Sequence, residues 1–175
     1  MGHDAGQLHP SLERVVAAAA TAGLPIEVER FPEGTRTAAD AARAVGCNIA
    51  QIVKSLVFVA DGEPVIVLVS GADRLDPARL AAAMGATVVR RADGDEARAA
   101  TGFAIGGVPP IGHARSMTIL MDERLLAYDL VWAAAGLPDA VFKAPPRELQ
   151  AAAGARVAAL AATETESTGI DRPHQ

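Results

Sequence analysis

The clearest hydrophobic pattern along the chain is a pair of β-branched runs, IVKSLVFVA and EPVIVLVS, on either side of Asp61 and Gly62. Asp-Gly between two such runs favours a tight turn, so the pattern predicts an antiparallel hairpin. Shorter stretches rich in Val, Ile, Phe and Trp predict further strands over 25–31, 87–90, 116–122, 128–134, 139–144 and 155–160.

Helical periodicity occurs between these strands and carries start and stop signals. Thr37 and Asp40 have the spacing of a capping box, and Asp76-Pro77 supplies an N-cap followed by proline at the first helical position. A glycine follows each apolar stripe. Helices are therefore expected over 10–23, 37–46, 76–85, 93–102 and 145–154.

This order of elements predicts an α+β fold. The central hairpin argues against a purely parallel doubly wound sheet, and we expect one mixed, mostly antiparallel twisted sheet with flanking helices. No linker or composition shift divides the chain, so a single domain is expected over residues 10–162. The polar ends, 1–9 and 163–175, are expected to be disordered tails, and a turn is expected at Glu33-Gly34.

Composition narrows the possible functions. A net charge of −5 argues against extensive non-specific binding to nucleic acid and leaves room only for a local basic patch. The single Cys47 cannot form an internal disulfide, which fits a reducing cytoplasm. The N-terminus lacks a signal-peptide pattern, and no apolar run reaches the roughly 20 residues that span a bilayer. We expect a cytoplasmic protein without membrane contact.

Lys54 is the first candidate for chemistry. Strand alternation places it on one face with Ile52, Leu56 and Phe58. It is also one of only two lysines among 16 basic residues, in a chain that otherwise uses Arg. A compact ammonium in a core-like strand suggests a site, because Arg cannot replace it there. The alternative is an ordinary lysine that reaches water or protects a strand edge.

The segment FAIGGVPPIGHARS, residues 103–116, is the second candidate. Its glycines and adjacent prolines exclude regular structure. Such a rigid loop can present main-chain N–H groups to a carbonyl oxygen or a phosphate, although it could equally be a simple connection. It lacks the spacing of a P-loop or a dinucleotide fingerprint.

Other reactive side chains give weaker signals. His113 could transfer a proton, but a lone loop histidine is more often a structural hydrogen-bonding group. The other histidines, His3, His9 and His174, fall in the expected tails. Cys47 has no activating neighbour and is interpreted as packing. No ligand spacing for a metal and no nucleophile elbow occurs, so neither a metal nor a cofactor is expected.

Six segments occur in an order and spacing that resemble the YbaK/EbsC family, relatives of the editing domain inserted in bacterial prolyl-tRNA synthetases. They are TAADAA (37–42), IVKSLVF (52–58), VSGADRLD (69–76), TGFAIGGVPPIGH (101–113), MDERLL (121–126) and VWAAAG (131–136). The resemblance covers about residues 10–162. IVKSLVF and GGVPPIGH are its specific parts, since alanine-rich helices match many proteins by chance.

The resemblance implies a trans-editing deacylase that hydrolyses the ester bond of a mischarged tRNA, typically tRNA-Pro carrying a small wrong amino acid. Lys54, Gly106, Gly107 and Pro110 match catalytic positions. The matched substrate-binding positions are Thr37, Ser55, Val108, Pro109, Gly112, His113 and Gly136. Proton transfer in the family is thought to rely on substrate groups, which agrees with the missing Ser-His-Asp set. His113 is given no proton-transfer role.

The partner implied by the resemblance is the acceptor end of an aminoacyl-tRNA, with a prolyl-tRNA synthetase as a candidate second partner. Local contacts could come from Lys54, Arg90, Arg91, Arg115 and Lys143, or these could be solvated surface charges. The alternative functions are a non-catalytic binding or regulatory module that kept the pocket, and an unrelated small-molecule hydrolase. The residues leave open which amino acid is removed.

Overall fold

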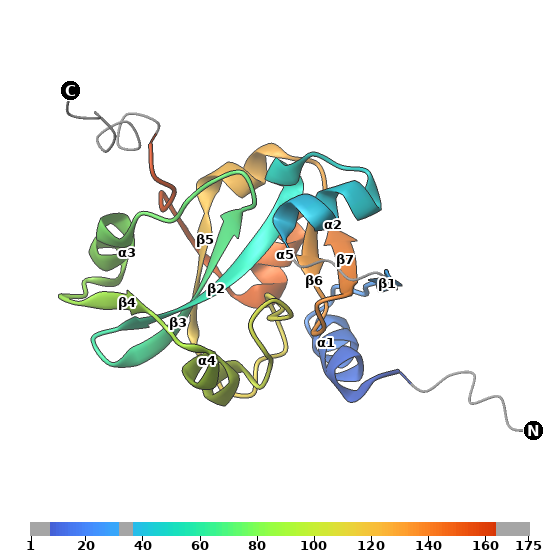
Figure 1. The fold of residues 1–175 in the computed structure, drawn as a ribbon, viewed down its shortest axis with the longest axis horizontal. Helices are drawn as coiled ribbons and strands as arrows, with labels where there is room; N and C mark the ends of the chain where they lie inside the picture. The colour runs from blue at the N-terminus through green and yellow to red at the C-terminus, as the bar shows by residue number, and fades with distance from the viewer. Residues whose placement is uncertain (1–7, 32–36, 164–175) are drawn as a thin grey trace, which may run out of the picture.

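The computed structural model describes residues 8–31 and 37–163. They form one α+β domain around a mixed sheet in the order β1-β7-β6-β2-β3-β5-β8, with β4 also paired to β2 (Figure 1). Four of the strand pairings are antiparallel and three are parallel, so the predicted fold class is confirmed.

The hairpin at the centre of the sheet consists of β2 (Ile52–Ala60) and β3 (Glu63–Ser70). Val57 pairs with Ile66 in an antiparallel register, as predicted. Asp61 has a positive φ of 47° and Gly62 one of 85°, the backbone that a tight hairpin turn requires. Figure 1 shows this hairpin crossing the middle of the molecule.

The remaining strands are shorter than the hairpin. They are β1 (Glu29–Arg30), β4 (Val89–Arg91), β5 (Thr118–Asp122), β6 (Val131–Ala134), β7 (Ala140–Ala144) and β8 (Arg156–Ala158). Of the strand predicted over 25–31, only Glu29–Arg30 is a strand in the structure. The strand predicted from 128 begins at Val131, and a 3-10 helix at Glu123–Ala127 that the pattern did not predict precedes it.

In the described part of the chain, five α-helices end within two residues of the glycines that the sequence signals predict. They are α1 (Pro10–Thr21), α2 (Ala38–Val45), α3 (Pro77–Met84), α4 (Gly94–Thr101) and α5 (Pro146–Ala153). The capping box of α2 is confirmed, since Thr37 Oγ1 accepts from Asp40 N and the Asp40 side chain accepts from Thr37 N. His9, expected in a tail, instead caps α1, its Nδ1 accepting from Ser11 N.

The two faces of the sheet carry different layers. The face of Ile66 and Leu68 packs against α1, α4, α5 and the loop between α4 and β5 in the largest buried cluster. On the face of Val65 and Val67, α3 covers one part of the sheet and α2 covers another through Ala41, Ala42 and Ile52. The boundaries at 10 and 162 stay a prediction. Residues 1–7 and 164–175 of the expected tails, and the turn at Glu33-Gly34, lie outside the described residues.

Candidate functional site at the open edge of the central strand

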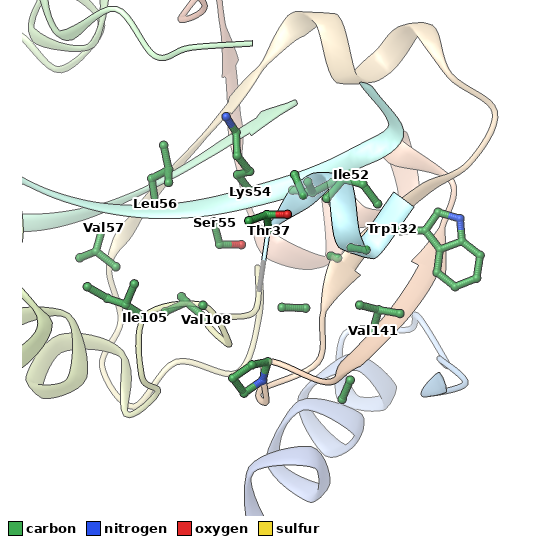
Figure 2. Close-up of a pocket in the computed structure, with 18 of the residues that line it drawn as sticks. Thr37, Ile52, Lys54, Ser55, Leu56, Val57, Ile105, Val108, Trp132 and Val141 are labelled. Carbon is green, nitrogen blue, oxygen red and sulfur yellow. The ribbon is translucent and has the colours of Figure 1, made fainter. Parts of the chain in front are cut away.

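A gap in strand pairing places a cavity beside β2. One edge of β2 pairs with β3 from Val53 to Ala60. On its other edge, β6 pairs only with Ile52 and Val53, and β4 only with Phe58 to Ala60. Within the described strands, residues 54–57 therefore have no partner strand on that edge. A cavity of about 310 Å³ opens there (Figure 2).

The cavity reaches both faces of β2 because it lies at the strand's edge. On one side, the start of α2 contributes Thr37, Ala38 and Ala41. On the other side lie Ile105 and Val108 of the Gly/Pro loop. Strands β6 and β7 add further apolar residues, of which Trp132 packs with the α2 residues. Most of the wall is apolar, as is usual for sites that hold small molecules or small groups of larger ones.

Lys54 lines the cavity, and its predicted catalytic role stays a prediction. Its half-buried side chain leaves β2 on the side opposite to Ser55 (Figure 2), and its Nζ donates a 2.6 Å hydrogen bond to the main-chain oxygen of Asp73. Burial lowers the pKa of Lys54 from its usual value, the charge of Asp73 partly opposes this, and Arg91 and Arg74 lower it further. The ammonium is thus held at the rim rather than inside the apolar wall.

Two cations, Lys54 and Arg91, lie on the cavity lining of this acidic chain, and the charge of Asp73 lies close to Lys54. Arg91 lines the cavity and is exposed, and Arg91 and Arg74 both repel the Lys54 charge. Arg90, predicted as a contact, is already engaged by Glu96 through two bonds of 2.8 and 2.7 Å, which lowers the pKa of Glu96 to about 2. Arg91 is therefore better placed than Arg90 to meet a phosphate.

Ser55 also lines the cavity, with its Oγ directed below β2 toward the apolar wall (Figure 2). That Oγ is buried and has no hydrogen-bond partner among the described residues. Thr37 lines the opposite side, but its hydroxyl oxygen accepts the capping bond of α2. The structure thus brings Lys54, Ser55 and Thr37 to one cavity.

The Gly/Pro loop divides into a part that lines the cavity and a part that supports it. Gly106 and Val108 lie on the lining. Gly106 has a positive φ of 94° and is exposed. Gly107 is buried, and a Cβ placed there would meet the Leu137 main chain at 3.1 Å, so this glycine permits close packing of the loop against the turn at 136–137.

The rest of the loop lies behind the cavity wall. Pro109 and Pro110 are buried, and neither they nor Gly112 and His113 lie on the lining. His113 Nε2–H donates to the Pro109 oxygen at 2.6 Å, and burial lowers the pKa of His113. A neutral histidine that holds the loop closed fits the structural interpretation given above.

Gly136 has a packing role in this structure. It is buried with a φ of 107°, and a Cβ there would come within 2.8 Å of the Ser11 oxygen. The turn it forms lies against the start of α1 and the Phe103 ring rather than on the cavity lining. For Gly136, as for Gly107, Pro109, Pro110, Gly112 and His113, a direct role toward a substrate stays a prediction.

Two residues of the site were not singled out in the sequence, Trp132 on the lining and Asp73 beside it. Trp132 lines the cavity where β6 leaves β2, with the Lys143 ammonium 5.7 Å from its ring centroid. Asp73, the residue that holds Lys54, also forms a 3.0 Å ion pair with Arg124. Asp73 lies in the VSGADRLD segment and Trp132 in VWAAAG, so both could have been flagged from the family segments, but neither had a pattern that indicated chemistry.

Other site types find little support in the described part of the chain. It contains no group of three or more His, Cys, Asp or Glu side chains that could hold a metal ion. Cys47 donates to the Asn48 oxygen, and burial raises the pKa of its thiol, which opposes nucleophilic use. None of the described helices has the length and apolarity needed to cross a bilayer.

Comparison with known proteins relates the chain to aminoacyl-tRNA editing domains. The chain is 38% identical over 104 residues to a proline--tRNA ligase of Acidithiobacillus ferrooxidans, covering 59% of this chain and 18% of that protein. It is 30% identical over 124 residues to the uncharacterized protein YwhH of Bacillus subtilis, covering 70% of this chain and 78% of that one. The chain thus spans less than a fifth of the ligase.

Solved structures agree over most of the fold. A protein proposed to be a trans-editing enzyme for prolyl-tRNA synthetase superposes with a TM-score of 0.84 at 47% identity, covering 90% of this chain and all of that one. The hypothetical protein APE2540 superposes with a TM-score of 0.79 at 31% identity, covering 85% of this chain and 99% of that one. Residues 32–152, which include β2 and the Gly/Pro loop, match the aminoacyl-tRNA editing domain. The chain belongs to the aminoacyl-tRNA editing domain family.

Proposed function

We propose that this protein is a trans-editing aminoacyl-tRNA deacylase that hydrolyses the ester of a mischarged tRNA, tRNA-Pro carrying a small wrong amino acid. One observation carries the proposal. In a chain of the editing-domain family, a small apolar cavity opens beside Lys54, with Arg91 at its rim. The end of an aminoacyl-tRNA complements both features, because it carries a small side chain next to an anionic phosphate.

The reaction adds water across the ester. The water oxygen forms a bond to the carbonyl carbon, the bond to the ribose oxygen breaks, and a proton reaches that ribose oxygen, which releases the free amino acid and the tRNA. An aminoacyl ester is already activated, so positioning of water and stabilisation of the oxyanion can suffice. This removes the need for a protein nucleophile.

Each part of the cavity has a proposed role. The apolar wall around Val57 and Val108 receives the amino-acid side chain. Lys54 and Arg91 hold the terminal phosphate or polarise the reacting carbonyl from the rim. Main-chain N–H groups at the open edge of β2 and around Gly106 are the candidates for binding the oxyanion. His113 is given no proton-transfer role, since it lies off the cavity lining and its Nε2–H holds the Pro109 oxygen.

The proposal that the substrate is tRNA-Pro is supported by the relatives of this chain. One matched relative is a proline--tRNA ligase and one matched structure is proposed to serve prolyl-tRNA synthetase. Binding discriminates poorly between small side chains, so an error-prone synthetase benefits from a separate hydrolytic check. The net charge of −5 suits contact limited to the acceptor end, with the rest of the tRNA held by a partner such as the synthetase.

The test is hydrolysis by the purified chain of tRNA-Pro charged with Ala, Ser, Thr, Cys or Pro, with p-nitrophenyl acetate as a generic ester and a parallel series in EDTA. We expect release of at least one wrong amino acid, sparing of Pro-tRNA, no generic esterase activity and no effect of EDTA. Binding without hydrolysis would favour the non-catalytic module. Hydrolysis of the generic ester alone would favour an unrelated hydrolase.

A further inference from the structure

The hydroxyl of Ser55 is the least explained polar group of the cavity. Its Oγ is buried with no hydrogen-bond partner, and it is the one such side-chain oxygen or nitrogen among the described residues. Buried hydroxyls are almost always paired, because an unpaired one has lost its water without replacement. A buried hydroxyl that lacks a partner beside a cavity indicates a partner that arrives with the ligand.

The main chain of Ser55 faces the same opening. Val57 O accepts from Ala92 N at 3.0 Å, which shows that the polar groups of Val57 point away from β3. Strand polar groups alternate between the two edges, so the N–H and C=O of Ser55 point to that edge too. Neither β4 nor β6 pairs with Ser55 in the described sheet.

The other polar side chains on the lining are occupied or lie at the rim. Lys54 donates to Asp73 O, Thr37 is exposed at the start of α2 and accepts the capping bond, and Arg91 is exposed. Around Ser55 the wall is made of apolar groups that include Val57, Val108 and Ala133. A ligand group that enters this wall therefore meets one free side-chain hydroxyl in an otherwise apolar surface.

We propose that Ser55 selects an amino acid with a short hydroxyl-bearing side chain, seryl or threonyl, over alanyl. This rests on the proposed deacylase function and names its substrate class. The Ser55 hydroxyl can both donate and accept, so it pairs with a substrate hydroxyl in either direction. Alanine would enter the same space and leave Ser55 unpaired, and a site built around a substrate hydroxyl discriminates against the analogue that lacks it.

Single-turnover deacylation of seryl-, threonyl- and alanyl-tRNA-Pro tests the proposal. Wild type should hydrolyse the seryl or threonyl ester at least about tenfold faster than the alanyl ester, about the effect of one net hydrogen bond. Ser55→Ala should reduce that ratio about tenfold, chiefly by slowing the hydroxylated substrate. Ser116→Ala, at an exposed loop position outside the lining, is the matched control and should leave the ratio unchanged.

The outcomes separate this inference from the proposed function. If wild type is active but prefers the alanyl ester, the inference is wrong and deacylation stands. If Ser55→Ala slows all three esters equally, Ser55 serves a group common to all of them, such as the α-amino group, and the selectivity claim is again wrong. If wild type hydrolyses no aminoacyl-tRNA, both fail. The wild-type preference does not depend on how any variant folds.

Discussion

The ammonium of Lys54 donates to the main-chain oxygen of Asp73 at 2.6 Å, which joins the central strand to the loop after β3. The contact places the charge at the cavity rim, with the Lys54 stem along the lining. It also means that Lys54 is partly desolvated without a direct carboxylate partner, because the Asp73 carboxylate is bonded to Arg124. Substitution of Lys54 should therefore change the activity of the protein much more than its stability.

Lys54→Met should leave the free energy of unfolding at neutral pH within about 1.5 kcal/mol of wild type, because the lost hydrogen bond is offset by removal of a desolvated charge. The folded pKa of Lys54 is lowered, so the unfolded state binds the proton more tightly. Wild-type stability should then rise relative to the variant as pH increases from that folded pKa toward the usual lysine value of about 10.4. Urea unfolding of both proteins at neutral and alkaline pH measures this, and a difference independent of pH would contradict it.

Arg91 and Arg90 are adjacent in sequence but should behave differently toward tRNA. Arg91→Ala should weaken binding of mischarged tRNA by about fivefold, roughly the 1 kcal/mol of an exposed charge contact, and should reduce the salt dependence of KM. Arg90→Ala should leave KM nearly unchanged, because Glu96 already engages that guanidinium. The measurement is KM of each variant at two salt concentrations. Equal changes in KM for the two variants would contradict a role of Arg91 in binding tRNA.

His113 should make the protein sensitive to acid through its structural role. Its pKa is lowered by burial, so as pH falls through about 6.5 the unfolded state gains a proton before the folded state does, and stability falls. His113→Gln cannot take up that proton and should lose less stability than wild type between pH 7 and pH 5. Thermal melts measure the difference in melting temperature between the two proteins across this range. A difference that does not change with pH would contradict the prediction.

Gly136 and Gly106 both have positive φ, yet alanine should be tolerated differently at the two positions. At Gly136 a Cβ would meet the Ser11 oxygen at 2.8 Å, whereas at Gly106 nothing lies within 4 Å. Gly106→Ala should cost about 1 kcal/mol from backbone strain alone, and Gly136→Ala should cost about 1–3 kcal/mol more because of overpacking. Chemical denaturation provides both values, and equal losses would contradict the packing role of Gly136.

Much of the fold could be predicted because its signals are local. The Asp61-Gly62 turn, the Thr37 capping box and the glycine that ends each helix act within a few residues, and the structure confirms them. The lengths of the edge strands could not be predicted, because tertiary pairing decides them. β1 is strand only where Glu29 and Arg30 meet β7.

The site was only partly predictable for the same reason. Alternation put Lys54 and Ser55 on opposite faces, and the family segments indicated the Gly/Pro loop. The cavity itself depends on where β6 and β4 stop pairing with β2, which no short segment determines. The difference between Gly106 on the lining and Gly107 packed against Leu137 likewise follows from contacts between residues far apart in sequence.

The central claim is that the cavity beside Lys54 hydrolyses aminoacyl-tRNA, and single-turnover deacylation of a mischarged tRNA-Pro by Lys54 variants tests it most directly. Lys54→Ala and Lys54→Arg should both lose most activity while circular dichroism stays native, since the planar guanidinium cannot take the place of a compact ammonium. Arg147→Ala, exposed on α5 and off the lining, is the control and should remain active. Lys54 variants within about threefold of wild type, less than 1 kcal/mol of barrier, would contradict the account.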